Sequence, residues 1–333
     1  PPDYYSGAGV GHVGAGTDLV MPREGIEERA RAAGIEVVTR STVLYKTALE
    51  AASEADLVVF VGASSSLENY DRPTLDLDWE APLLIERLAA VKPVVVLMQS
   101  PGPMAVPWRD NPNIVGIVNS FLGGEQIGRA WGSVLFGDMN PAGKLPVSFP
   151  WWKDGVIESF RGVAPHPEGI FTSYRRDDAR RVYAYPFGHG LSYTNFSYGS
   201  LAELPMASCD GALRAWEDGV PVRVCLGLNV TNSGGRSGAE VAQAYVHFPQ
   251  PEADMRGALV LKGFHRTRVL APGESELALF ALTPRELSTW DLASGGFTLR
   301  PRMTVHAGSS SIDLRSSLEL ALPAADGAGA GAP

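Results

Sequence analysis

Cysteine is nearly absent from this sequence of 333 residues, which contains only Cys209 and Cys225. They are too few and too far apart for a metal site of the Cys-x-x-Cys kind. We interpret both as buried or free thiols, with a single disulfide between them as the alternative. No strand precedes the glycines at 7, 9 and 11, which argues against a dinucleotide fingerprint. We therefore expect neither a metal nor a cofactor.

A basic surplus and a long apolar run are also missing. The chain has 37 acidic and 28 basic side chains, and its net charge of −9 gives no support to nucleic-acid binding. No stretch approaches the ~18 apolar residues that span a membrane, so no membrane partner is expected. No signal peptide is visible. The chain begins at Pro1 rather than Met, so we expect a processed product or a fragment, which leaves a secreted or extracytoplasmic location open.

Apolar runs alternate with helical patterns through the first 140 residues. Strands are predicted at 35–39, 57–61, 94–98 and 113–119. Helices are predicted at 23–33, 48–54, 78–91 and 125–136, the third of them capped by Asp78. Strands that are apolar throughout and alternate with helices indicate a mostly parallel sheet with both faces covered.

The pattern changes after Pro141, where a long connection dense in Pro, Gly, Trp and Tyr begins. From Val220 the apolar residues alternate with period 2, and segments at 222–230, 241–248, 274–282 and 297–307 are predicted strands. This pattern is typical of an antiparallel sandwich of the immunoglobulin or fibronectin type. The predicted fold class is α/β plus all-β. The predicted domains are an α/β domain at 1–150, a wrapping connection at 151–200, a β-sandwich at 201–322 and a disordered tail at 323–333.

One loop after a predicted strand carries the best candidate for chemistry. The strand at 57–61 leads through Gly62 into a polar loop that contains Glu68, Asp71 and Arg72. Open α/β sheets bind ligands beyond the carboxyl ends of their strands, so Glu68 is a candidate proton donor. The alternative is that Glu68 and Arg72 form a solvated loop pair.

Several segments, in one order along the chain, carry specific motifs. They are the start of the chain at 4–26, the loop ENYDR at 68–72, GDMNPAGKLPVSFP at 137–150, EGI at 168–170 followed by YR at 174–175, YPFGHGLSYT at 185–194, and VTNSG, LKGF and LAPGE between 230 and 274. Together they resemble the C-terminal half of glycoside hydrolase family 3, a family of many β-glucosidases and β-xylosidases. The resemblance covers nearly the whole chain and implies a second α/β domain followed by a fibronectin type III-like domain.

The resemblance implies hydrolysis of terminal β-linked glycosides with retention, β-glucosides first and β-xylosides second. Retaining glycosidases place two carboxyl groups about 5 to 5.5 Å apart across the scissile bond. By the resemblance Glu68 is the acid/base, and burial in a closed sugar site would raise its pKa. Arg72 is assigned a structural role, paired with Asp71. Asn69 departs from the family, which has Gly at this position, and the change could redirect Glu68.

The nucleophile is missing from this chain. In the family it is an Asp of a preceding (β/α)8 barrel, which needs ~200 residues or more. Asp56, Asp76 and Asp78 are interpreted as strand-end or cap residues. We therefore expect this chain alone to be incomplete and its partner to be a barrel from a missing part or from another chain. The competing hypothesis is a non-catalytic carbohydrate-binding or scaffolding remnant.

Four other side chains have both a structural and a functional interpretation. Trp108, Trp151 and Trp152 could line a sugar subsite, but packing at an interdomain surface is favoured. His189 lies in a Gly-rich turn and is interpreted as a structural contact between the connection and the sheet, not as a base.

Overall fold

The computed structural model describes residues 12, 14, 16–42, 44–69, 72–152, 169, 171–176, 182–210, 220–248, 259–291 and 294–323. The chain divides into two compact units, each assembled from separate segments. Unit 1 comprises Pro1–Met139, Val147–Pro165 and Arg181–Tyr185, and unit 2 comprises Asn140–Pro146, His166–Arg180 and Pro186–Pro333. The chain passes between the units after residues 139, 146, 165, 180 and 185, which is five times. The predicted domain boundaries remain predictions.

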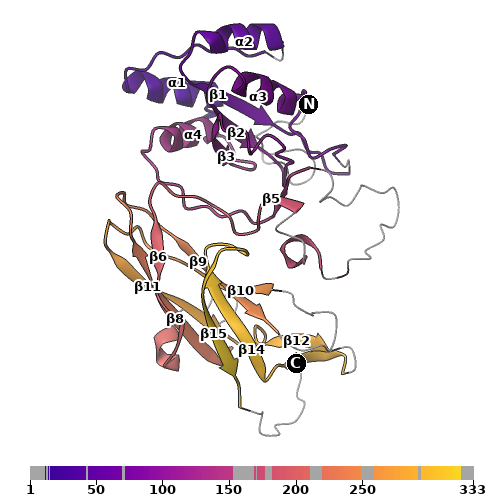
Figure 1. Ribbon diagram of the computed structural model, residues 1–333, viewed down its shortest axis with the longest axis vertical. Coiled ribbons are helices and arrows are strands. Elements are labelled where there is room, and N and C mark those ends of the chain that lie inside the picture. The colour runs from indigo at the N-terminus through magenta and orange to yellow at the C-terminus, as the bar shows by residue number, and fades with distance from the viewer. Residues whose placement is uncertain are drawn as a thin grey trace. The chain divides into compact units, whose positions relative to one another are not determined.

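A three-stranded parallel sheet lies at the centre of unit 1 (Figure 1). Strands β1 (Val58–Ala63), β2 (Val94–Gln99) and β3 (Ile114–Asn119) are hydrogen-bonded in that order. Four helices accompany them: α1 (Pro22–Ala32), α2 (Tyr45–Ser53), α3 (Ala81–Ala89) and α4 (Ile127–Leu135). A short pair, β4 (Phe149–Pro150) with β5 (Tyr183–Tyr185), completes the regular structure of the described part of unit 1.

The middle strand is covered on both faces. Leu97 of β2 packs against Ile127 and Trp131 of α4. Val96 and Met98, which alternate with Leu97 and so point to the opposite face, are also buried. α3 contacts both β1 and β2. The predicted α/β class is confirmed.

Two local predictions in unit 1 are wrong. No strand forms at 35–39, where the chain has no regular secondary structure and the side chains of Ile35, Val37 and Val38 are exposed. An apolar segment becomes a strand only when a neighbouring strand pairs with it, and none of the described strands does. The helix predicted from Asp78 begins at Ala81, because left-handed backbone at Trp79 and Glu80 precedes it.

Unit 2 is an antiparallel β-sandwich (Figure 1). One sheet has the order β10 (Leu259–Arg266), β9 (Val241–His247), β14 (Arg302–Gly308) and β15 (Leu314–Ala321). The other has the order β11 (Ser275–Leu282), β8 (Val224–Asn232) and β6 (Phe196–Tyr198), and β7 (Ala202–Leu204) also pairs with β8. Leu226, Val246, Phe280 and Val305 belong to one core shared by the two sheets. The predicted sandwich is confirmed.

The segment predicted as one strand at 297–307 is two strands. β13 (Gly296–Leu299) pairs with β12 (Ser288–Asp291), and β14 begins at Arg302. Pro301 separates them because proline has no N–H to donate to a sheet. The described part of unit 2 also contains two short 3₁₀ helices, η2 (Ser173–Arg175) and η3 (Met206–Cys209).

Cys209 and Cys225 form a disulfide, so the interpretation as free or merely buried thiols is wrong. β7 pairs with β8 so that Leu204 lies opposite Cys225, and η3 follows β7 directly. This brings the two Cα atoms to 5.8 Å, within the range that a disulfide needs.

We expect the double variant Cys209→Ser/Cys225→Ser to unfold with a free energy about 3 kcal/mol lower than that of the oxidised protein. The reason is that the bond closes a loop with a sequence separation of 16 residues, which restricts the unfolded chain. Urea unfolding measures the difference. Adding a reductant should lower the stability of the parent protein and leave the double variant unchanged. Equal stability of the oxidised parent and the variant would contradict the prediction.

Residues Asn140–Pro146, called the strap below, are hydrogen-bonded to residues 188–193 of unit 2. Asn140 Oδ1 accepts hydrogen bonds from Ser192 Oγ at 2.9 Å and Tyr193 N at 2.8 Å. Leu145 N donates to the His189 carbonyl oxygen at 2.8 Å, and Gly188 N donates to the Leu145 carbonyl oxygen at 2.8 Å. Two of the motifs found in the sequence, at 137–150 and 185–194, therefore bind each other.

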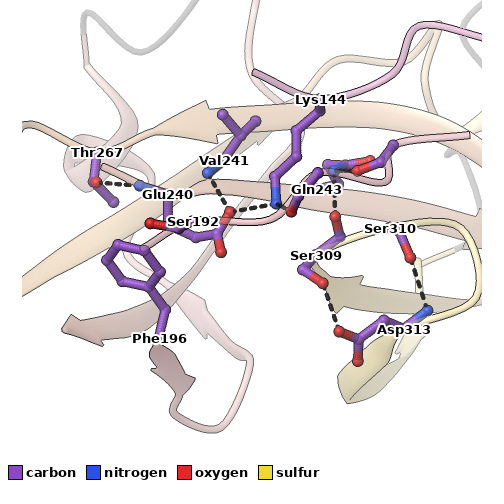
Figure 2. Close-up of polar contacts among 12 residues, drawn as sticks. Lys144, Ser192, Phe196, Glu240, Val241, Gln243, Thr267, Ser309, Ser310 and Asp313 are labelled. Atoms are coloured by element: carbon purple, nitrogen blue, oxygen red, sulfur yellow. Dashed lines mark hydrogen bonds and ion pairs between the residues drawn. The ribbon is translucent and has the colours of Figure 1, made fainter. Parts of the chain in front are cut away.

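A buried ion pair fastens the strap to the sandwich (Figure 2). Lys144 Nζ lies 2.8 Å from Glu240 Oε1, and the two side chains are only 12% and 8% exposed. Lys144 Nζ also donates to the Gly190 carbonyl oxygen at 3.1 Å. Glu240 Oε1 accepts from Val241 N at 2.6 Å, and Glu240 N donates to Thr267 Oγ1 at 3.0 Å. Both charges are thus paired and hydrogen-bonded, as buried charges must be.

Candidate active site

Polar residues lie at or directly after the ends of the three parallel strands of unit 1, at the edge where open α/β sheets bind ligands. Ser64 N, just after β1, donates to the Gln99 carbonyl oxygen of β2 at 3.0 Å. Ser100 Oγ, just after β2, lies 3.0 Å from Asn119 Oδ1 of β3 and 2.9 Å from the Gly102 carbonyl oxygen. These contacts tie the strand ends together, so the loop that follows β1 starts from a fixed base.

Glu68 lies in a turn five residues beyond β1, and its side chain is exposed. The sequence prediction that Glu68 follows a buried-sheet strand into a loop at the carboxyl edge agrees with this position. Its assignment as the acid/base remains a prediction.

Asn69 holds the turn in a left-handed conformation, with φ of 69°. Glycine is the usual residue there, and Asn is among the few others that adopt this conformation at low cost. Asn69 therefore adopts the backbone that a glycine would also favour.

Arg72 is half-buried and binds backbone and sulfur atoms. Its Nη2 donates to the Pro103 carbonyl oxygen at 3.1 Å, and its Nη1 lies 3.1 Å from Met104 Sδ. Burial lowers the pKa of the guanidinium, and the carboxylate of Asp78 opposes that shift. These contacts give Arg72 a structural role. Its predicted partner Asp71 lies outside the described residues.

A second loop, 72–80, is fixed to the end of β1 by Asp78. Asp78 Oδ2 accepts a hydrogen bond from Ser65 N at 3.0 Å, and Asp78 N donates to the Ala63 carbonyl oxygen at 2.9 Å. Asp78 is thus not the cap of α3, because its carboxylate serves the neighbouring loop. At the other side of this loop, Tyr45 OH of α2 donates to Glu80 Oε2 at 2.7 Å.

Two consecutive residues of this loop, Trp79 and Glu80, have left-handed backbone with φ of 62° and 56°. For residues other than glycine this conformation costs about 1–2 kcal/mol each. At this pair of residues the chain turns outward. Leu77 and Ala81 on either side are 3% and 5% exposed, whereas Trp79 is 73% exposed.

The two loops and the start of α3 border an open cavity of about 710 Å³. Its lining residues are Ser64, Ser65, Ser66, Leu67, Arg72, Pro73, Thr74, Asp76, Leu77, Asp78, Trp79, Glu80, Pro82 and Leu83. The volume is within the range of about 300–1,000 Å³ found for small-molecule sites. Leu67, which precedes Glu68, belongs to the wall, so the cavity opens beside the candidate proton donor.

Sequence reasoning did not find Trp79 or the role of Asp78. Left-handed positions are usually marked by Gly or Asn, and Trp79 and Glu80 give no such signal. Of the tryptophans considered in the sequence, Trp108 is buried in unit 1, whereas Trp152 is exposed. Trp151 lies under the guanidinium of Arg109, whose Cζ is 4.7 Å from a ring centroid.

The described residues contain no group of three or more His, Cys, Asp or Glu side chains placed to hold a metal ion. Within the same part of the chain, every helix is too short or too polar to cross a membrane.

Known proteins resemble this chain in sequence and in structure. Probable beta-glucosidase L of Aspergillus terreus is 34% identical over 325 residues, covering 89% of this chain and 43% of that protein. A beta-glucosidase of Rhizobium radiobacter is 32% identical over 323 residues, covering 92% of this chain and 36% of that protein. The crystal structure of beta-D-glucoside glucohydrolase from Trichoderma reesei matches with a TM-score of 0.84 at 28% identity, covering 96% of this chain and 47% of that one. This chain therefore spans less than half the length of these relatives.

Two family models match as well. A fibronectin type III-like domain matches residues 240–311, within unit 2. The glycosyl hydrolase family 3 C-terminal domain matches residues 2–193, which is more than half of the 333 residues. On this match, and on the α/β unit and β-sandwich that the structure contains, the chain belongs to glycosyl hydrolase family 3.

Proposed function

We propose that this chain is part of an enzyme that hydrolyses terminal β-linked glucosides with retention, and that Glu68 is its acid/base. The observation that carries the proposal is the position of Glu68, on a turn held by left-handed Asn69 beyond the carboxyl end of β1 and beside a cavity. The names of the relatives favour glucose over xylose as the sugar.

In this proposal Glu68 acts twice. As a carboxylic acid it donates its proton to the glycosidic oxygen while a second carboxylate attacks the sugar from the opposite face. As a carboxylate it then takes a proton from the water that releases the sugar. The second carboxylate is expected on a (β/α)8 barrel outside this chain. Since Glu68 is exposed here, the barrel and the bound sugar are expected to bury it in the complete enzyme.

The proposal is tested by restoring the missing part. The coding sequence upstream of Pro1, or a co-purifying chain, should contain a barrel with a candidate Asp nucleophile. Protein with the barrel should hydrolyse aryl β-glucosides faster than aryl β-xylosides, and the 333-residue chain alone should hydrolyse neither measurably. A barrel-containing protein inactive on both substrates would overturn the proposal and favour a non-catalytic carbohydrate-binding role.

A further inference from the structure

We propose that Trp79 binds the second sugar ring of a disaccharide substrate, on the leaving-group side of the scissile bond. This inference rests on the function proposed above, because it takes Glu68 as the group that protonates the leaving oxygen. It assigns to this chain a binding residue that selects the leaving group.

The cavity beside Glu68 has an apolar wall and a polar wall. Leu67, Trp79 and Leu83 form the apolar part, and all three side chains are exposed. Ser66, Asp76 and Asp78 are among the polar lining residues. A pyranose ring has the same two-sided character, with C–H groups on its faces and hydroxyl groups around its edge. An aryl group would use only the apolar wall, so the lining favours a sugar ring.

The carboxylate of Asp76 can accept a hydrogen bond from a sugar hydroxyl group. Within the described part of the chain it makes no hydrogen bond or ion pair, whereas Asp78 is engaged by Ser65 N and Glu80 by Tyr45 OH. Carboxylates accept hydrogen bonds strongly, so Asp76 can bind a sugar hydroxyl without breaking a hydrogen bond or ion pair to any of the described residues.

The backbone holds Trp79 in place for such a contact. Asp78 is tied to Ser65 and Ala63 on one side of Trp79, and Glu80 is tied to Tyr45 on the other. Left-handed backbone at an aromatic residue persists only where the surroundings impose it, and such strain concentrates at ligand sites. A backbone fixed in this way loses little conformational freedom when a ring stacks on the Trp79 side chain.

The position of Glu68 indicates on which side of the scissile glycosidic bond the ring bound by Trp79 lies. An acid/base must reach the glycosidic oxygen, which joins the two sugar rings. The nucleophile and most contacts to the first ring are expected on the barrel. The surface that this chain places next to Glu68, by way of Leu67, is then left for the second ring.

Binding to the 333-residue chain tests the inference without any hydrolysis. Saturation-transfer NMR with cellobiose should give a clear signal for the parent chain, lose most of it in Trp79→Ala and keep it in Trp79→Phe. Trp152→Ala is the matched control, because Trp152 is also exposed in unit 1 but does not line the cavity. Methyl β-glucoside, which has no second ring, should give a weak signal with every variant. Equal cellobiose signals from the parent and Trp79→Ala would overturn the inference.

Kinetics of the barrel-containing protein separate this inference from the proposed function. Trp79→Ala should lower kcat/KM about tenfold on cellobiose, chiefly through KM, and leave methyl β-glucoside nearly unchanged. A loss on phenyl β-glucoside as large as that on cellobiose would assign Trp79 to aryl groups and overturn the sugar-ring assignment. An equal loss on all three would also overturn it, with the proposed function intact. A protein inactive on all three would overturn the proposed function, and the NMR result would still decide whether Trp79 binds the disaccharide.

Discussion

Glu68→Gln in the barrel-containing protein should lower kcat on cellobiose by about 10²- to 10⁴-fold, the usual contribution of general acid–base catalysis. Glutamine keeps the size of the side chain but cannot protonate the leaving oxygen. The loss should be much smaller on aryl glucosides with activated leaving groups, whose departing oxygen needs little proton transfer. Azide should then restore part of the turnover, because it attacks the glycosyl-enzyme without the base that water requires. Steady-state rates on the two substrate types measure the difference.

The controls for this experiment come from the same unit. Glu86→Gln changes an exposed glutamate of α3, and it should leave both rates within about twofold. Asn69→Gly should retain activity, because Gly favours the φ of 69° found there, whereas the β-branched Asn69→Val should reduce it. Near-wild-type rates of Glu68→Gln on both substrates would remove Glu68 from the mechanism.

Lys144→Met should lower the free energy of unfolding of the chain by about 3–5 kcal/mol. The substitution removes the ion-pair partner of Glu240 and leaves its carboxylate buried. Among the described residues, Val241 N is then the remaining hydrogen-bond donor to it, and Arg315 acts on it only as a nearby charge. Urea unfolding of the parent chain and of Lys144→Met measures the difference.

The double variant Lys144→Met/Glu240→Gln is the decisive comparison. It replaces the charged Glu240, which Lys144→Met leaves without its ion-pair partner, by a neutral residue that can still accept the hydrogen bond from Val241 N. It should therefore recover most of the lost stability. Lys46→Met is the matched surface control, because Lys46 pairs with Glu50 at 3.9 Å with both side chains exposed, and no measurable change is expected. If Lys144→Met were as stable as Lys46→Met, the pair would contribute nothing.

The sequence was sufficient for features that depend on local pattern. The apolar run that ends at Gly62 predicted a buried strand followed by a loop, and Glu68 lies in that loop. The alternation after Val220 predicted β8 and its sandwich. These predictions succeed because the period of burial is a direct consequence of strand and helix geometry.

Features that depend on pairing over long distances were not predictable. Asp78 before a helix looks like an N-cap in sequence, and only the fold brings Ser65 N to its carboxylate. The disulfide needed the pairing of β7 with β8, which no spacing of two cysteines reveals. The left-handed pair at Trp79 and Glu80 had no signal, because it is carried by residues that usually avoid this conformation.

Because the chain crosses between the two units five times, the units are difficult to separate at the level of the gene. A gene segment that ends at Tyr185 would carry the strap, and Lys144 with it, away from the unit that contains Glu240. A segment that begins at Pro186 would encode a sandwich in which the carboxylate of Glu240 has lost its ion-pair partner, Lys144. Domains that spread between genes as independent modules have boundaries that few contacts cross. The two units of this chain lack such a boundary at residue 185. Recombination at that point should therefore be selected against, and the two units should be inherited together.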